Sequence, residues 1–226
     1  MASEVDICNL ALGHLGDNAT VASIDPPEGS AQAEHCARFY PIARDTLLEL
    51  HSWNFASRRA QLAQVDCPWP EWRYAYAQPA NTINVVAVLP PQANNDYSQN
   101  AYTGSGFGTT SWERRPPAAG LYVPQPFACE TDANGNNVIY TNQEQAVLRY
   151  IVRVEDPTQF SPLFVQTLTW HLASMLAGPV VKGDAGAAEA KRCAAMMSAW
   201  LARATASDAN QRKADAEHIV NWMAGR

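Results

Sequence analysis

The side chains best suited to hold a metal ion in this 226-residue sequence are five cysteines and five histidines. No Cys-x-x-Cys or His-x-x-x-His spacing occurs, and the neighbours His35 and Cys36 would face different sides of a helix. Cys8, Cys36 and Cys193 fall in helical patterns, where cysteine is usually a small core residue. We therefore predict no metal site and no other cofactor.

Groups suited to catalysis are equally sparse. Asp45 and Glu49 stand one helical turn apart, a spacing typical of a solvated helix face. The glycine-rich residues 104–108 lack the Lys-Ser/Thr ending of a phosphate-binding loop. The sequence leaves open a nucleophile assembled from distant residues, but no nucleophile-elbow pattern is present. We predict that the protein is not an enzyme.

Aromatic residues near arginines could stack single-stranded bases. The set comprises Trp69, Trp72, Tyr74, Tyr97, Tyr102 and Trp112, with Arg58, Arg59, Arg114 and Arg115. The net charge of −6 and the lack of a basic stripe argue against a nucleic-acid binder. Since Tyr, Trp and Arg also anchor protein–protein interfaces, we favour a protein partner.

The overall composition sets further bounds. Apolar residues make up 47% and charged residues 17%, enough for a substantial core. The odd number of scattered cysteines favours a reducing cytosol over a disulfide framework. The N-terminus lacks the features of a signal peptide. No apolar run is as long as the about 18 residues that a membrane-spanning helix needs. We expect no membrane association.

The elements that must position these residues follow a simple order along the chain: helical patterns lie at both ends and strand patterns lie in the middle. Helical patterns cover residues 3–15, 30–51, 161–178 and 185–206, and we predict that Asp208 caps a last helix reaching Met223. Strand patterns cover residues 72–76, 83–89, 127–130, 138–140 and 146–154, with a hairpin turn at residues 132–136. Residues 92–126 contain a polar stretch that favours a long loop excursion.

The predicted fold class is therefore α+β, mainly α. Its N- and C-terminal helices form an antiparallel helical bundle, residues 1–66 and 155–226, and a β-rich domain, residues 67–154, is inserted between them. Trp53 and Phe55 end the long helix, and we predict a buried packing corner that wedges the helices against the β-rich part. Arg58 and Arg59 follow as solvated charges or as contacts to the acids of a neighbouring subunit.

Several segments in order resemble the tail tubular protein A family of short-tailed bacteriophages, the head-to-tail adaptor or gatekeeper below the portal. They are ICNLALGHLGD, VASIDPPEGSAQAEHCARFYPIARDTLLELHSWNFASRRAQLA, WRYAYAQPANTINVVAV, and VIYTNQEQAVLRYIVRVEDPTQFSPLFVQTLTWHLASMLAGPVV. The resemblance covers most of the chain and is weakest in residues 92–126 and after Asn210. It brings no catalytic motif.

The resemblance implies a virion structural protein of the tail or neck, made in the host cytoplasm. Its expected partners are copies of itself in a ring of about twelve, the portal protein, the tail nozzle protein and tail fibres. Double-stranded DNA would pass through the lumen without specific binding, which suits an acidic chain. The candidate interface residues are Arg58, Arg59, Tyr97, Tyr102, Trp112, Arg114, Arg115, Trp222, Met223 and Arg226.

Two other classes stay open. The first is a tail-associated cell-wall hydrolase in the β-rich middle, and the second is a nucleic-acid-binding accessory protein.

Overall fold

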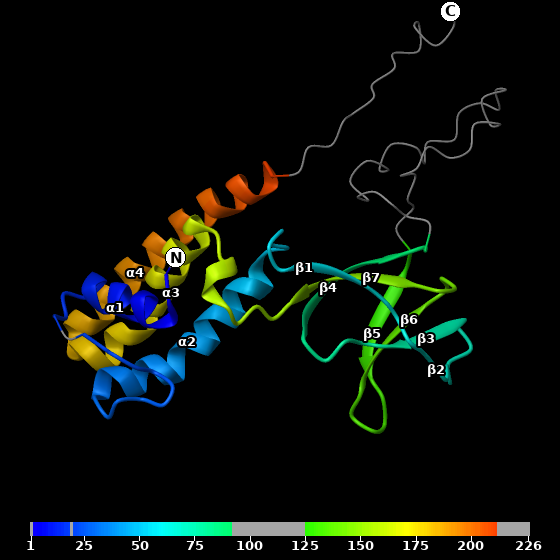
Figure 1. Cartoon of the computed structure of the whole chain (residues 1–226), viewed down its shortest axis with the longest axis horizontal. Coiled ribbons are helices and arrows are strands. Elements are labelled where there is room, and N and C mark those ends of the chain that lie inside the picture. Colours follow the sequence, from blue (N-terminus) through cyan, green and yellow to red (C-terminus); the bar gives the residue numbers. More distant parts are fainter. Residues whose placement is uncertain (1, 19, 92–124, 212–226) are drawn as a thin grey trace, which may run out of the picture. The chain divides into compact units, whose positions relative to one another are not determined.

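The computed structural model describes residues 2–18, 20–91 and 125–211, which form two compact units. The helical unit joins Met1–Ser57 to Ile151–Gln211, and the strand unit lies within Arg58–Tyr150. Figure 1 shows the elements of each unit. Of the helices in these ranges, none combines the length and the apolar character that crossing a bilayer requires.

The predicted fold class is wrong. The described residues form four α-helices and seven strands, the strands in two antiparallel sheets, with 46% helix and 21% strand, and this is not a helical bundle with an inserted domain. Part of the reason is that residues 57–65 carry no apolar alternation, so we assigned them to the helical part. The chain forms strand β1 (Ser57–Gln61) there because its backbone pairs with a distant strand, which outweighs the weak local pattern.

Three of the four described α-helices begin at side-chain caps. Helix α1 (Glu4–His14) starts with a capping box in which Ser3 and Asp6 bond each other's backbone N–H groups. Helix α2 (Ala31–Leu50) is capped by Ser30 and continues through Pro41. Helix α3 (Pro162–Val181) begins with Ser161 as cap and proline in its first turn.

Helix α3 is the centre of the helical unit, because α1, α2 and α4 (Gly183–Ala209) all pack against it. Lys182 alone separates α3 from α4, with a φ of 62° that reverses the chain. The unit's core combines apolar residues from α1, α2 and α3: Ile7, Leu12, Leu47, Leu48, Phe164, Leu168, Leu172 and Leu176. Cys8, Cys36 and Cys193 are fully buried, so the prediction that they are core residues is confirmed.

Gly186 sets the close approach of α4 to α3. A Cβ at this position would lie 2.9 Å from the backbone carbonyl oxygen of Ala177, which cannot move away as a side chain can. We expect Gly186→Ala to lower the free energy of unfolding by about 1–3 kcal/mol through overpacking. The matched control is Gly13→Ala in α1, where a Cβ meets nothing within 4 Å. That variant should be neutral or gain up to about 1 kcal/mol. Urea unfolding of both variants tests this, and an equal response would contradict it.

The strand unit contains two sheets with the orders β1-β7-β4 and β2-β3-β6-β5. The strands not yet named are β2 (Gln64–Val65), β3 (Tyr74–Ala77), β4 (Thr82–Leu89), β5 (Phe127–Thr131), β6 (Asn137–Thr141) and β7 (Val147–Val152). The second sheet buries Ala75, Val138 and Tyr140 on one face, against Cys67, Trp72 and Ala128.

The predicted hairpin turn at residues 132–136 is confirmed. It joins β5 to β6, with Cys129 opposite Ile139. The Asp132 carboxylate accepts backbone N–H groups of Asn134 and Asn136, both at 2.8 Å. Gly135 supplies the positive φ of 84° that the turn requires.

Candidate functional site

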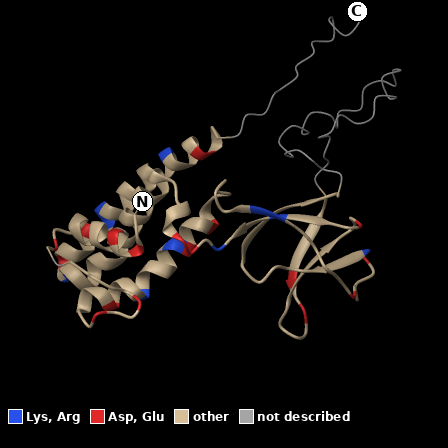
Figure 2. Cartoon of the chain, in the orientation of Figure 1, with Lys and Arg blue, Asp and Glu red and all other residues tan. Residues whose placement is uncertain are grey.

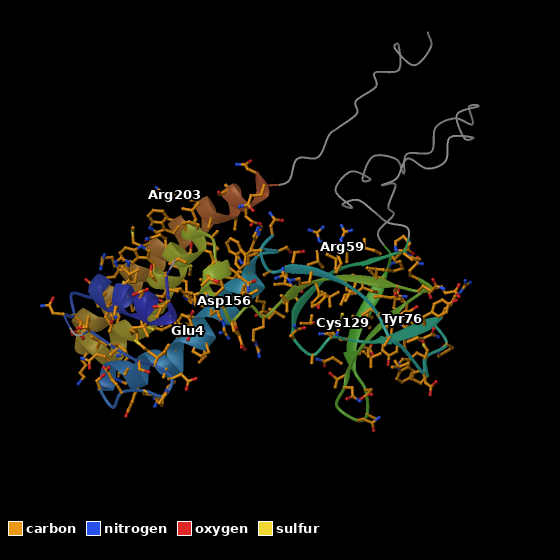
Figure 3. All side chains as sticks on the ribbon, viewed as in Figure 1. Glu4, Arg59, Tyr76, Cys129, Asp156 and Arg203 are labelled. Atoms are coloured by element: carbon orange, nitrogen blue, oxygen red, sulfur yellow. The ribbon has the colours of Figure 1, made fainter. Side chains whose placement is uncertain are left out.

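Arg58 and Arg59 lie on β1, at one edge of its sheet, where they form a basic segment (Figure 2). Both side chains are exposed. Successive residues of a strand point to opposite faces, so both faces of the sheet edge are open to solvent at this point. Arg59 is labelled on this strand in Figure 3. Exposed arginines on an edge strand are suited to contact a partner by charge.

The other candidate interface residues fall outside the ranges that the structure describes. They are Tyr97, Tyr102, Trp112, Arg114, Arg115, Trp222, Met223 and Arg226. The structure therefore places two of the ten candidates, and both belong to the same strand.

The groups considered for chemistry do not come together in the described residues. No cluster of three or more His, Cys, Asp or Glu side chains there could hold a metal ion. Asp45 is engaged by two arginines, with Arg44 Nε at 2.9 Å from one carboxylate oxygen and Arg153 Nε at 3.0 Å from the other. This bridge ties the buried Arg44 of α2 to the chain just after β7, whereas Glu49 is exposed.

The aromatic corner, defined as Trp53, Phe55, Phe160 and Phe164, occupies the turn after α2. Trp53 is fully buried, and its ring centroid lies 5.0 Å from that of Phe164 in an edge-to-face arrangement. Phe55 lies 5.1 Å from Phe164 and 5.8 Å from Phe160. The predicted burial of Trp53 in a packing corner is confirmed. All four rings belong to the helical unit, so the corner stabilises this unit itself, and its wedging against the β-rich part stays a prediction.

Trp53 also caps α2. Its indole N–H donates to the carbonyl oxygen of Leu47 at 2.7 Å. Leu47 stands in the last turn of α2, where carbonyl groups have no partner within the helix. One side chain thus fills the core and satisfies a buried helix end.

Asp208 forms a clasp with His51 and Asn54, which we call the Asp208 clasp. Its carboxylate accepts the backbone N–H of Asn54 at 3.1 and 3.2 Å and lies 3.3 Å from His51 Nε2. The Asn54 side-chain amide donates to the backbone oxygen of Asp208 at 2.6 Å. The predicted role of Asp208 as a helix cap is wrong, because it lies in the last turn of α4, and the predicted helix from there to Met223 falls outside the described residues.

The Asp208 clasp compensates an unfavourable local position. A carboxylate in the last turn of a helix opposes the helix dipole, and α4 has no basic residue there. Asp208 is nonetheless only 6% exposed. Its contacts with residues 51–54 must therefore stabilise the charge, which makes them the anchor of the end of α4.

A second junction joins three helices around Trp170. The imidazole of His14 stacks on this indole, with centroids 3.7 Å apart and planes within 7°. The Arg192 guanidinium lies 5.5 Å from the same ring and donates to the backbone oxygen of His14 at 2.9 Å. Glu189 accepts from Arg192 Nε at 2.6 Å. Residues of α1, α3 and α4 are thereby held together.

The two histidines in this region should make the protein sensitive to acid. Burial, and then the charge of Arg192, lower the pKa of His14, and burial lowers the pKa of His171. The folded chain thus favours the neutral form of both imidazoles. Their contribution to the free energy of unfolding is complete above the pKa of about 6.5 that histidine has in the unfolded chain. It is lost as pH falls through the lower folded pKa values.

We expect the urea unfolding midpoint to decrease between about pH 7.5 and pH 5.5, a range above the titration of ordinary carboxylates. His14→Gln should make this decrease smaller, because Gln binds no proton. A midpoint that is unchanged over this range, or a His14→Gln profile identical to that of the original chain, would contradict the assignment.

The interactions that sequence reasoning missed depend on long-range contacts. Asp208 meets Asn54 across 154 positions, and His14 meets Arg192 across 178. The one available signal was the acid in the last turn of α4 without a basic neighbour.

A search of family models finds none that matches the chain, and no curated protein matches it.

Proposed function

We propose that this chain is a virion structural protein of a short-tailed bacteriophage, the head-to-tail adaptor that forms a ring between portal and tail nozzle. Its mechanism is assembly, with energy from subunit interfaces rather than from catalytic turnover. The observation that carries the proposal is the ordered series of segments that resembles this family.

These segments coincide with framework elements of the fold. ICNLALGHLGD spans most of α1 and the residues that end it, and SWNFAS supplies Trp53 and Phe55 of the aromatic corner. WRYAYA contains β3, and YIVRVED contains the end of β7 and Arg153, which pairs with Asp45. The resemblance therefore rests on residues that build the framework of the fold.

Charge supports the same function. A chain with a net charge of −6 has little tendency to retain DNA that passes through a lumen. The exposed basic segment of β1, Arg58 and Arg59, offers a local attraction for acidic neighbours. Charged rims of this kind affect association rate and register more than affinity.

The test is retention of the full-length chain on an immobilised portal ring of the same phage. We expect saturable retention that a second, soluble portal ring competes away. The hydrolase alternative predicts release of cell-wall fragments without portal binding, and the nucleic-acid alternative predicts DNA retention that falls steeply with added salt. Either result in place of portal retention would overturn the proposal.

A further inference from the structure

Trp69 is a large apolar side chain left in solvent. It lies in the connection between β2 and β3, residues 66–73, which we call the Trp69 loop (Figure 1). Its side chain is 48% exposed, whereas Trp53 is fully buried. Val65, at the end of β2, is a further exposed apolar residue at 38%. Tryptophan is one of the residues enriched among those that dominate the binding energy of protein interfaces.

The Trp69 loop is held in one shape by its base. The Cys67 thiol donates to the carbonyl oxygens of Trp69 at 3.6 Å and Trp72 at 3.4 Å, and the Trp72 N–H donates to the oxygen of Trp69 at 3.3 Å. The N–H of Arg73 donates to Asn142 Oδ1 at 3.1 Å. Cys67 and Trp72 also pack against the core of the second sheet.

Two prolines restrict the loop further. Pro68 and Pro70 flank Trp69, and each has its φ fixed by its ring. A loop tied at its base and restricted at its tip loses little conformational entropy on binding. The exposed indole is therefore preorganised for contact with a partner.

Charge narrows the class of partner. Asp66 and Glu71 are exposed on either side of Trp69, and Arg73 is the one basic residue among residues 66–73. The loop thus keeps a net negative charge. An anionic lipid surface or a nucleic acid would be repelled, whereas a protein pocket rimmed by Lys or Arg would be attracted.

We propose that the Trp69 loop is a docking knob, whose indole enters an apolar pocket with a basic rim on a partner protein of the virion. This inference rests on the proposed function, which makes the portal ring and the nozzle protein the proteins to test. The indole supplies apolar burial, and Asp66 and Glu71 supply charge complementarity with the rim.

The experiment measures the affinity of the 226-residue chain for the immobilised portal ring and, separately, for the immobilised nozzle protein. We expect Trp69→Ala to weaken binding to one of the two by at least about tenfold. Trp69→Phe should recover part of this loss. The double variant Asp66→Asn with Glu71→Gln should slow association at low salt and reduce its dependence on salt.

The matched control is Ile42→Ala, which trims another exposed apolar side chain, 52% exposed on α2. It should leave both affinities unchanged, and urea unfolding should show all variants folded. If the original chain binds and Trp69→Ala binds equally well, the docking knob is wrong and the adaptor proposal stands. An equal loss in Ile42→Ala would also overturn it. If the original chain binds neither probe, the proposed function itself fails.

Discussion

Trp53→Ala should lower the free energy of unfolding by about 3–5 kcal/mol, the range found for removing a buried Trp or Phe side chain. The variant loses the ring contacts with Phe164 and Phe55 and leaves the Leu47 carbonyl without its donor. Small domains have a total free energy of unfolding of about 5–15 kcal/mol, so this loss is a large part of the total. Urea unfolding and soluble yield are the measurements.

Trp53→Phe separates the two roles of this residue. It keeps much of the ring volume and loses the N–H bond to Leu47, so we expect a clearly smaller loss than for alanine. The variant should stay folded and bind its partners normally. A Trp53→Ala protein of unchanged stability that has lost partner binding would contradict the structural role and place Trp53 in a functional site.

Asp208→Ala should lower the free energy of unfolding by about 1.5–3 kcal/mol, because hydrogen bonds to a charged group are lost and the Asn54 N–H is left without its acceptor. Hydrogen exchange of the Asn54 amide should accelerate, and the last turn of α4 should fray first. Asp208→Asn keeps one acceptor oxygen, so its free energy of unfolding should fall by less than that of Asp208→Ala.

Asp184→Ala is the matched control. Asp184 is also a carboxylate of α4, but it is exposed in the first turn, where the helix dipole favours it. We expect its removal to lower the free energy of unfolding by about 0.3–1 kcal/mol. If Asp208→Ala has no larger effect than Asp184→Ala, the clasp does not anchor the end of α4.

The local elements were predictable where one segment carries its own signal. Helices α1, α2 and α3 begin within one residue of the predicted helical patterns, and the Asp132 turn has the composition its geometry needs. The burial of Trp53 also followed from its place at the end of an amphipathic helix. Each of these depends on neighbours within a few residues.

The fold class was not predictable because it depends on pairing between distant segments. β1 has two exposed arginines and no alternation, and only its pairing in the order β1-β7-β4 makes it a strand. The sequence around Asp208 does not reveal its role, because its partners, His51 and Asn54, are about 155 positions away. Side chains that act across such distances give no periodic signal.

The mass of the complex between this chain and the portal ring, measured by light scattering, tests the central claim most directly. The account predicts a stable complex that contains about one copy of the chain per portal subunit, with closed ring symmetry. A chain that keeps its own mass in the presence of excess portal ring would contradict the adaptor function.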